Sequence, residues 1–207
     1  MADKKKKSMA YPVIFMLVLT GILTLALAFI NQKAEPKIEF NKDIELKQKI
    51  LYVFDVVPED ATPENIDKTF NELVTEADKQ FNDKPVYLLK ENGEDKAYAV
   101  PFTGPGLWGS IEGYLGINKD MKTVTGIEFI KQDETPGLGG RIAEPEYKEQ
   151  YRSLDISNPV GGEIVINKPA EGGNVDAIAG ATQTSSFVTK MLNKDIQDFI
   201  NSWGGNQ

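Results

Sequence analysis

An uncharged apolar stretch near the amino terminus decides how this chain can fold. Residues 9–30 read MAYPVIFMLVLTGILTLALAFI and contain no charged side chain. An α-helix rises 1.5 Å per residue, so about 20 apolar residues cross the hydrocarbon core of a bilayer. The stretch therefore predicts one transmembrane helix, with the rest of the chain folding in water.

The charges beside this helix predict its orientation. Residues 1–8 carry four lysines and one aspartate, whereas the residues after the helix mix both signs. The positive-inside rule then indicates a basic cytoplasmic tail at 1–8, a transmembrane helix at 9–30 and an extracytoplasmic body. A cleaved signal peptide is the alternative, because Ala26 to Ala28 resembles a cleavage site, but its apolar region is usually only about 7–15 residues long. We expect a single-pass anchor in the cell membrane.

The composition excludes several classes of chemistry. The 207 residues include no His and no Cys, which rules out disulfides, thiolate metal sites, His-ligated haem and a Ser-His-Asp triad. The net charge of −8 would repel a nucleic-acid backbone, so we expect no nucleic-acid partner. We also expect no metal site and no catalytic side chain. Redox chemistry here would need an organic cofactor held by oxygen atoms and backbone groups.

Between the membrane helix and residue 84 the sequence predicts a linker and helical segment, at 31–83. Residues 31–43 are polar and are expected to form the linker. Apolar residues then recur at helical spacing over 44–54, and again after Thr62-Pro63, which is an N-cap and first-turn signal. We expect both helices to lie against the domain, close to the membrane.

Residues 84–207 are expected to form one domain of antiparallel strands with packed helices, which makes the fold class α+β. The apolar period changes from helical spacing to alternation at residue 84, and it becomes helical again near the end. The expected elements are two hairpins turning at Asn92-Gly93 and near residues 118–122, short strands at 162–167 and 175–180, and a helix over 184–203.

A cluster of hydroxyl side chains stands where that last helix begins, in the stretch DAIAGATQTSS at 176–186. One hydroxyl would be enough for an N-cap, which is the plainer interpretation. However, a helix N-terminus also favours a phosphate, and small residues let a ligand approach the backbone. The stretch thus predicts either a helix cap or a site for a phosphorylated ligand. Its hydroxyl residues are Thr182, Thr184, Ser185 and Ser186, and its small residues are Gly180 and Ala181.

Two glycine-containing stretches add to the candidate site. DETPGLGGR at 133–141 has three glycines in four positions, which would let its backbone run against a flat ligand, although it also fits an ordinary strand-exit loop. It lacks the Lys-Ser/Thr ending of a phosphate-binding loop. TGPGLWGS at 103–110 sets Trp108 among small residues, where the indole can either stack on a ring or fill the core.

These stretches together resemble the FMN-binding domain family. DAIAGATQT resembles the family's flavinylation motif, Asp-x-x-Ser/Ala-Gly-Ala-Thr-x-Thr, with Ala179 at the variable Ser/Ala position. ETPGLGG resembles its second hallmark, and the two stand in the family's order. Within the family, the chain is similar to the G subunit of the Rnf complex and to the C subunit of the sodium-pumping NADH:quinone oxidoreductase (Nqr). The resemblance is strongest from about residue 98 to residue 192.

The resemblance implies that FMN is esterified through its phosphate to the hydroxyl of Thr184. A flavin transferase, which uses FAD as donor and reads Asp176, would make this bond. Thr135 and Leu138 would lie nearest the ring, and Arg141 would pair either with a flavin oxygen or with a surface acid. The cofactor-binding residues that we expect are Thr184, Thr182, Ser185, Gly180, Ala181, Asp176, Glu134, Thr135, Gly137, Leu138, Gly139 and Trp108.

The implied function is electron transfer, without stand-alone catalysis, in a membrane-bound ion-translocating ferredoxin:NAD oxidoreductase of the Rnf type. Its partners would be the other membrane subunits of the complex. The C subunit of Nqr is the alternative. It is commonly longer than this chain, but the sequence Gly-Leu-Trp at 106–108 looks more like that subunit. A membrane-tethered, non-redox binding or sensor module is the rival from another class. A hydrolase or transferase with Thr184 as nucleophile is disfavoured, because no base is evident nearby.

Overall fold

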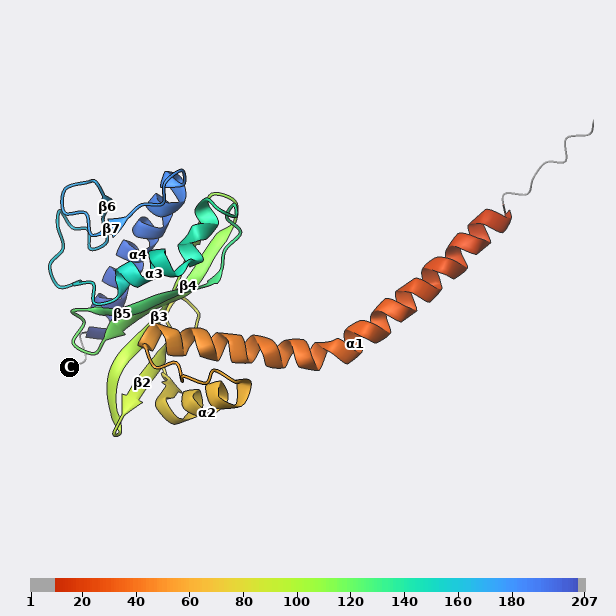
Figure 1. The fold of residues 1–207 in the computed structure, drawn as a ribbon, viewed down its shortest axis with the longest axis horizontal. Helices are drawn as coiled ribbons and strands as arrows, with labels where there is room; N and C mark the ends of the chain where they lie inside the picture. Colours follow the sequence, from red (N-terminus) through yellow and green to blue (C-terminus); the bar gives the residue numbers. More distant parts are fainter. Residues whose placement is uncertain (1–9, 205–207) are drawn as a thin grey trace, which may run out of the picture. The chain divides into compact units, whose positions relative to one another are not determined.

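One long helix, α1 (Ala10–Phe54), contributes to both units into which the chain divides, Met1–Asp43 and Ile44–Gln207 (Figure 1). The structure is a computed structural model that describes residues 10–204. Within that range, α1 is the one helix long and apolar enough to cross a bilayer, and its apolar part is exposed. This fits the predicted single-pass anchor. The predicted tail at 1–8 and the first residue of the predicted span lie outside the described residues.

The predicted polar linker at 31–43 is helical, because α1 continues through it and includes Pro36. A proline removes one backbone donor and clashes with the preceding turn, which disfavours a helix interior. The polar residues here are mostly strong helix formers, however, and the chain contains no glycine between residues 31 and 54. An i,i+4 ion pair between Lys49 and Glu45, 2.8 Å long, adds support further along the same helix.

A five-stranded antiparallel sheet forms the centre of the second unit, and each strand pairs with its neighbour in the chain. Both predicted hairpins are confirmed. The first turns at Asn92 and Gly93, with φ of +52° and +80°, as a two-residue hairpin turn requires. The strands are β1 (Val74–Glu76), β2 (Tyr87–Glu91), β3 (Glu94–Pro105), β4 (Ser110–Asn118) and β5 (Val124–Lys131).

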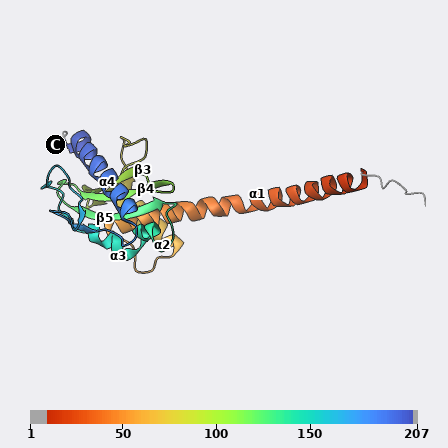
Figure 2. The ribbon, with the colours of Figure 1, turned by 90° about the horizontal axis from the view of Figure 1, so that it is seen from above.

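Helices cover both faces of this sheet, as the two views in Figures 1 and 2 show. Side chains of a strand alternate between faces, and β3 divides accordingly: Val100 and Phe102 join one core cluster, whereas Ala97 and Ala99 join the other. The first cluster packs under α4 (Thr182–Trp203), the confirmed C-terminal helix. The second packs under residues 44–54 of α1 and under α2 (Pro63–Leu73). The fold is thus α+β, as predicted.

Short helical turns lead from β5 back across the face that carries α4. They bring Tyr147 and Tyr151 into its core, where the Tyr151 hydroxyl donates a hydrogen bond of 2.9 Å to that of Tyr147. These turns also place the glycine-rich stretch close to the start of α4. The elements are η1 (Gly139–Ala143), α3 (Pro145–Lys148) and η2 (Glu149–Tyr151).

The predicted strands at 162–167 and 175–180 form only two short segments, β6 (Asn167–Lys168) and β7 (Val175–Asp176), which pair in parallel. Side chains pair the backbone groups that a neighbouring strand would otherwise pair. Asn193 on α4 accepts from the backbone N–H groups of Ile164 and Val165, at 2.7 and 2.8 Å, and donates to the Val165 carbonyl at 2.8 Å. Buried backbone groups must be paired, and here an amide side chain pairs them.

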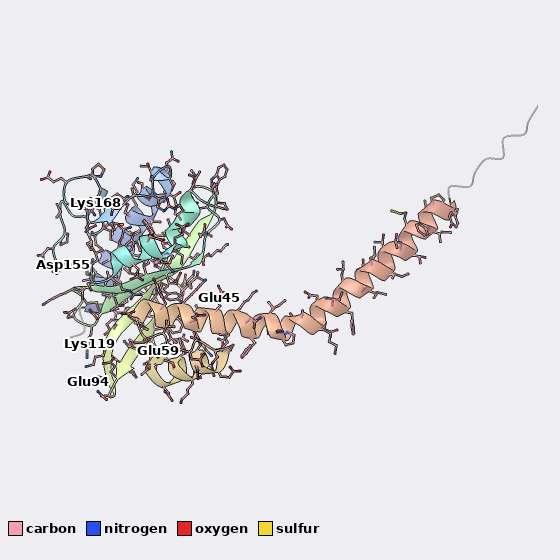
Figure 3. The ribbon with its side chains drawn as sticks, viewed as in Figure 1. Glu45, Glu59, Glu94, Lys119, Asp155 and Lys168 are labelled. Atoms are coloured by element: carbon pink, nitrogen blue, oxygen red, sulfur yellow. The ribbon has the colours of Figure 1, made fainter. Side chains whose placement is uncertain are left out.

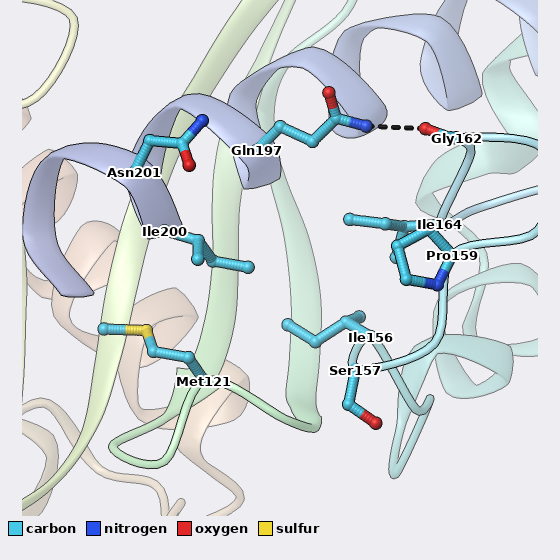
Figure 4. Close-up of a pocket in the computed structure, with 9 residues that line it drawn as sticks. All are labelled: Met121, Ile156, Ser157, Pro159, Gly162, Ile164, Gln197, Ile200 and Asn201. Carbon is cyan, nitrogen blue, oxygen red and sulfur yellow. Dashed lines mark hydrogen bonds between the residues drawn. The ribbon is translucent and has the colours of Figure 1, made fainter. Parts of the chain in front are cut away.

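Replacing Asn193 with alanine should destabilise the fold strongly. The change leaves two buried N–H groups and one carbonyl without partners, so we expect a loss of about 2–4 kcal/mol in the free energy of unfolding, measured by urea denaturation. The control is Gln197→Ala, which removes an exposed bond of 2.7 Å to the Gly162 carbonyl (Figure 4) and should cost less than about 0.5 kcal/mol. Equal losses in the two variants would contradict this account.

The buried tyrosines predict a loss of stability at alkaline pH. Burial raises the pKa of Tyr147 to about 12, and it raises the pKa of Tyr151 further above its ordinary value. In the unfolded chain both titrate near pH 10, so between pH 10 and about 12 only the unfolded state releases these protons. The free energy of unfolding should therefore fall by up to about 1.4 kcal/mol per pH unit for each tyrosine, with no effect below pH 10. Urea denaturation at several pH values measures the slope, which Tyr147→Phe should reduce; an unchanged slope would refute the assignment.

Candidate functional site

Charged side chains of the described residues lie mostly at the surface, as those labelled in Figure 3 do, but three carboxylates are buried. Glu128 is bonded to Lys148 at 2.6 Å, and Asp195 lies 3.5 Å from Lys194. Glu134 is only 5% exposed and forms no ion pair within residues 10–204. Burying a carboxylate without a cation is costly unless hydrogen bonds satisfy its oxygens, so the donors that surround Glu134 are of interest.

Glu134 is held by three hydrogen-bond donors from two other segments. Its Oε1 accepts from the backbone N–H groups of Leu107 at 2.8 Å and Trp108 at 3.1 Å, in the turn between β3 and β4. Its Oε2 accepts from the hydroxyl of Thr184, on the first turn of α4, at 2.5 Å. One carboxylate therefore joins the three stretches that the sequence singled out.

Two glycines make room for this carboxylate. A Cβ atom at Gly106 would lie 2.5 Å from Glu134 Oε1. A Cβ atom at Gly139 would lie 2.6 Å from Thr184 Oγ1 and 2.7 Å from Glu134 Oε2. Real Cβ contacts are longer, so any larger residue at either position would push the pair apart. Gly106 and Gly139 thus let the Glu134 carboxylate lie close to the backbone. The sequence predicts such close approach for the glycines at 137–140, but toward a flat ligand.

The start of α4 leaves backbone donors free. Its N-cap is Ala181, which offers no side-chain cap, and the first intrahelical bond runs from Ser185 N to the Ala181 carbonyl at 3.1 Å. The N–H groups of Thr182, Gln183 and Thr184 precede that bond and have no intrahelical acceptor. Ser185 Oγ turns away and accepts from Ile178 N at 3.0 Å. None of the hydroxyls is therefore the N-cap, and the helix start can receive an anion.

These segments enclose a cleft of about 460 Å³, which is within the size range of small-molecule sites. Most of the predicted site residues line it. The sequence analysis missed Leu107 and Gln183, whose only signal was their place beside Trp108 and between two threonines. The residues that line the cleft are Leu107, Trp108, Glu134, Thr135, Leu138, Gly139, Gly180, Ala181, Thr182, Gln183 and Thr184.

Three of the predicted residues do not line the cleft. Gly137 occupies a turn position with φ of +73°, and Ser185 is fully buried under the helix start. Asp176 is exposed, pairs with Lys168 at 3.2 Å, and borders a smaller pocket of about 160 Å³. Arg141 borders that pocket too and pairs with Glu144 at 2.9 Å, which is the surface pairing considered from the sequence.

The cleft has the features that FMN requires. Three apolar side chains stand exposed at it: Trp108 is 71% exposed, Leu107 47% and Leu138 45%. Such surface suits a flat ring, while the free N–H groups of α4 and the Thr184 hydroxyl suit a phosphate. No Lys or Arg is among the described residues that line the cleft. The positive end of the helix would therefore supply the attraction for the phosphate's charge.

A second cavity, of about 580 Å³, lies between the 156–164 loop, the β4–β5 turn and α4 (Figure 4). Its described lining contains Met121, Ile200 and Gln197 but no ionisable side chain and no helix start. It shares no residue with the glycine-containing stretches at 103–110 and 133–141. Size alone does not make this cavity a phosphate site.

Comparison with known families points to one class of domain. Residues 106–197 match the family described as the FMN-binding domain. The matched region includes both motifs and every described residue that lines the cleft, and the resemblance inferred from the sequence is confirmed.

Two relatives are named as subunits of the same kind of complex. The C subunit of the Na⁺-translocating NADH-quinone reductase of Pasteurella multocida is 37% identical over 50% of this chain and 42% of its own length. The same protein of Vibrio anguillarum is 35% identical over 56% of this chain and 49% of its length. The match thus spans about half the length of these curated relatives.

Two solved structures share the fold. The crystal structure of the C subunit of this reductase from Parabacteroides distasonis has a TM-score of 0.63 and 26% identity, covering 78% of this chain and 92% of that one. NqrC of Shewanella oneidensis has a TM-score of 0.64 at 20% identity, over 80% of this chain and 98% of that one. The predicted fold class is confirmed.

Replacing Gly139 with alanine should destabilise the site. The added Cβ collides with Thr184 Oγ1 and Glu134 Oε2, so we expect a loss of about 1–3 kcal/mol in the free energy of unfolding, measured by thermal denaturation. Gly140→Ala is the matched control, because its nearest new contact is the Thr135 carbonyl at 3.3 Å. The close-approach role of Gly139 would be refuted if Gly140→Ala were the more harmful change.

Proposed function

We propose that this chain is an electron-transfer subunit of a membrane-bound, ion-translocating oxidoreductase and carries FMN esterified to Thr184. The observation that carries the proposal is the position of the Thr184 hydroxyl. It lies at the free N-terminus of α4, inside a cleft within a matched FMN-binding domain.

Each part of the cleft has a role in this proposal. The N–H groups of Thr182, Gln183 and Thr184 hold the phosphate, and the partial positive charge of the helix start offsets its charge. Leu138 and Trp108 contact the ring and shield it from water. When bound, FMN supplies the ability to accept and release electrons one at a time or in pairs. The chain itself positions the cofactor and tunes its potential.

The anchor explains why a covalent bond would be useful. With a basic cytoplasmic tail at 1–8 and the span at 9–30, the domain lies on the outer side of the membrane. A cofactor that dissociated there would be lost to the surroundings. In this proposal a flavin transferase attaches FMN from FAD and reads the exposed Asp176. The other membrane subunits of the complex supply the electron donor, the electron acceptor and the ion path.

Two related complexes use a protein of this kind. The relatives described above are named as subunits of Na⁺-translocating NADH-quinone reductase, which favours the Nqr type over the Rnf type expected from the sequence. The purified complex separates the two: oxidation of NADH by quinone supports the Nqr type, whereas NAD reduction by reduced ferredoxin supports the Rnf type.

Replacing Thr184 with alanine should abolish covalent flavin. Chain co-produced with the transferase should gain the mass of FMN less one water and show flavin fluorescence on a denaturing gel. Thr184→Ala should show neither, because it lacks the oxygen that forms the ester. Intact-mass spectrometry makes the measurement.

Ser186→Ala is the control, since Ser186 is a hydroxyl residue on the same helical turn that does not line the cleft and should leave attachment intact. If Thr184→Ala keeps the added mass, the attachment site lies elsewhere. A wild-type chain without flavin, when matured with the transferase, would instead favour the tethered non-redox module.

A further inference from the structure

We propose that Glu134 accepts the proton of the Thr184 hydroxyl when the phosphoester forms. This chain would then carry its own catalytic base for the modification. The inference rests on the proposed function, because it concerns how Thr184 becomes the attachment site. It also revises the sequence-based expectation of no catalytic side chain and no base near Thr184.

The geometry is that of an activated nucleophile. Thr184 Oγ1 and Glu134 Oε2 lie 2.5 Å apart, at the short end of charge-assisted O–H···O⁻ bonds. A threonine hydroxyl is a weak nucleophile until an adjacent base takes its proton. The base here is itself oriented by a third group, since the N–H groups of Leu107 and Trp108 hold Oε1 in place. Base, nucleophile and orienting group are all present.

No other described group at the cleft could take this proton. Glu134 is the single titratable side chain among the described lining residues, and the chain contains no histidine. Thr184 is only 1% exposed, so its hydroxyl has little access to solvent bases. The route for the proton therefore leads to Glu134.

A purely structural role does not explain why this residue is a glutamate. A glutamine could accept the same two backbone N–H groups through its carbonyl and could donate its amide to Thr184 Oγ1. It would fasten the three segments without burying a charge that has no cation. Two glycines also clear space around the carboxylate oxygens. What a carboxylate adds to a glutamine here is the capacity to take a proton.

The reaction balances with a flavin dinucleotide as co-reactant. Thr184 Oγ1 attacks the phosphorus on the riboflavin side of the phosphoanhydride held by the transferase. The new Oγ1–P bond forms, the P–O bond to AMP breaks and its electron pair leaves with AMP, and the hydroxyl proton passes to Glu134 Oε2. The protonated carboxyl can then donate a hydrogen bond, so the buried site avoids two neighbouring anions.

The experiment measures attachment rather than electron transfer. The full-length chain in detergent is mixed with purified transferase and FAD, and the added mass is followed over time at several transferase concentrations. In Glu134→Gln the maximal rate should fall at least about 100-fold, the usual contribution of a general base. The transferase concentration that gives half the maximal rate should not change, because docking does not require the buried carboxylate. Glu163→Gln, in an exposed turn, is the matched control and should react at the wild-type rate.

Three results would overturn the inference or the proposal beneath it. If Glu134→Gln reaches the wild-type maximal rate, the base belongs to the transferase and the inference fails while Thr184 attachment stands. If it changes only the half-saturating concentration, Glu134 acts in docking and the inference again fails. If wild-type chain gains no mass, the proposed function fails first.

Thermal denaturation of each variant checks that it is folded. Should Glu134→Gln fail to fold, Glu134→Asp replaces it, because it keeps the charge but moves the carboxylate back by one methylene. That variant should attach FMN more slowly than wild type, and a wild-type maximal rate would overturn the inference.

Discussion

The hydrogen bond between Thr184 and Glu134 is the interaction on which the site depends. Glu134 follows β5, Thr184 stands on the first turn of α4, and the carboxylate also holds the turn between β3 and β4. Without this bond Glu134 would keep its contact with the β3–β4 turn but would lose its hydrogen bond to α4, and non-directional apolar contact would not fix the hydroxyl at the free end of the helix. A buried carboxylate without a cation is unfavourable for stability unless hydrogen bonds satisfy it, and here three donors do so.

The rest of the fold serves to seat α4. The sheet buries one face against this helix, where Val188 and Leu192 are fully buried. Asn193 pairs the backbone of Ile164 and Val165, so the chain that leads toward the 176–186 stretch is fixed to the same helix. The opposite face of the sheet receives residues 44–54 of α1 and α2, which belong to the same unit as the site.

Much of this arrangement could be predicted, and the failures share a cause. Asn92-Gly93 predicted its hairpin because the turn conformation depends on those two residues alone. The strands near 162–180 were predicted too long and the helical conformation of the linker at 31–43 was not predicted, since polarity and short apolar runs are ambiguous between structures. A polar stretch can continue a helix, and an asparagine from a distant helix can take the place of a strand partner. The cleft residues Leu107 and Gln183 carried no motif of their own.

The sequence by itself determined the apolar stretch long enough to span a membrane, the exclusion of histidine and cysteine chemistry, and the hydroxyl-rich stretch that contains Thr184, because these depend on residue type and local order. Only the tertiary structure decided which group touches that threonine. Glu134 stands 50 residues earlier in the chain, and its carboxylate reaches Thr184 because the sheet and the turns after it bring the two ends together while glycines leave the space open. Such a contact depends on long-range packing, which no local pattern encodes.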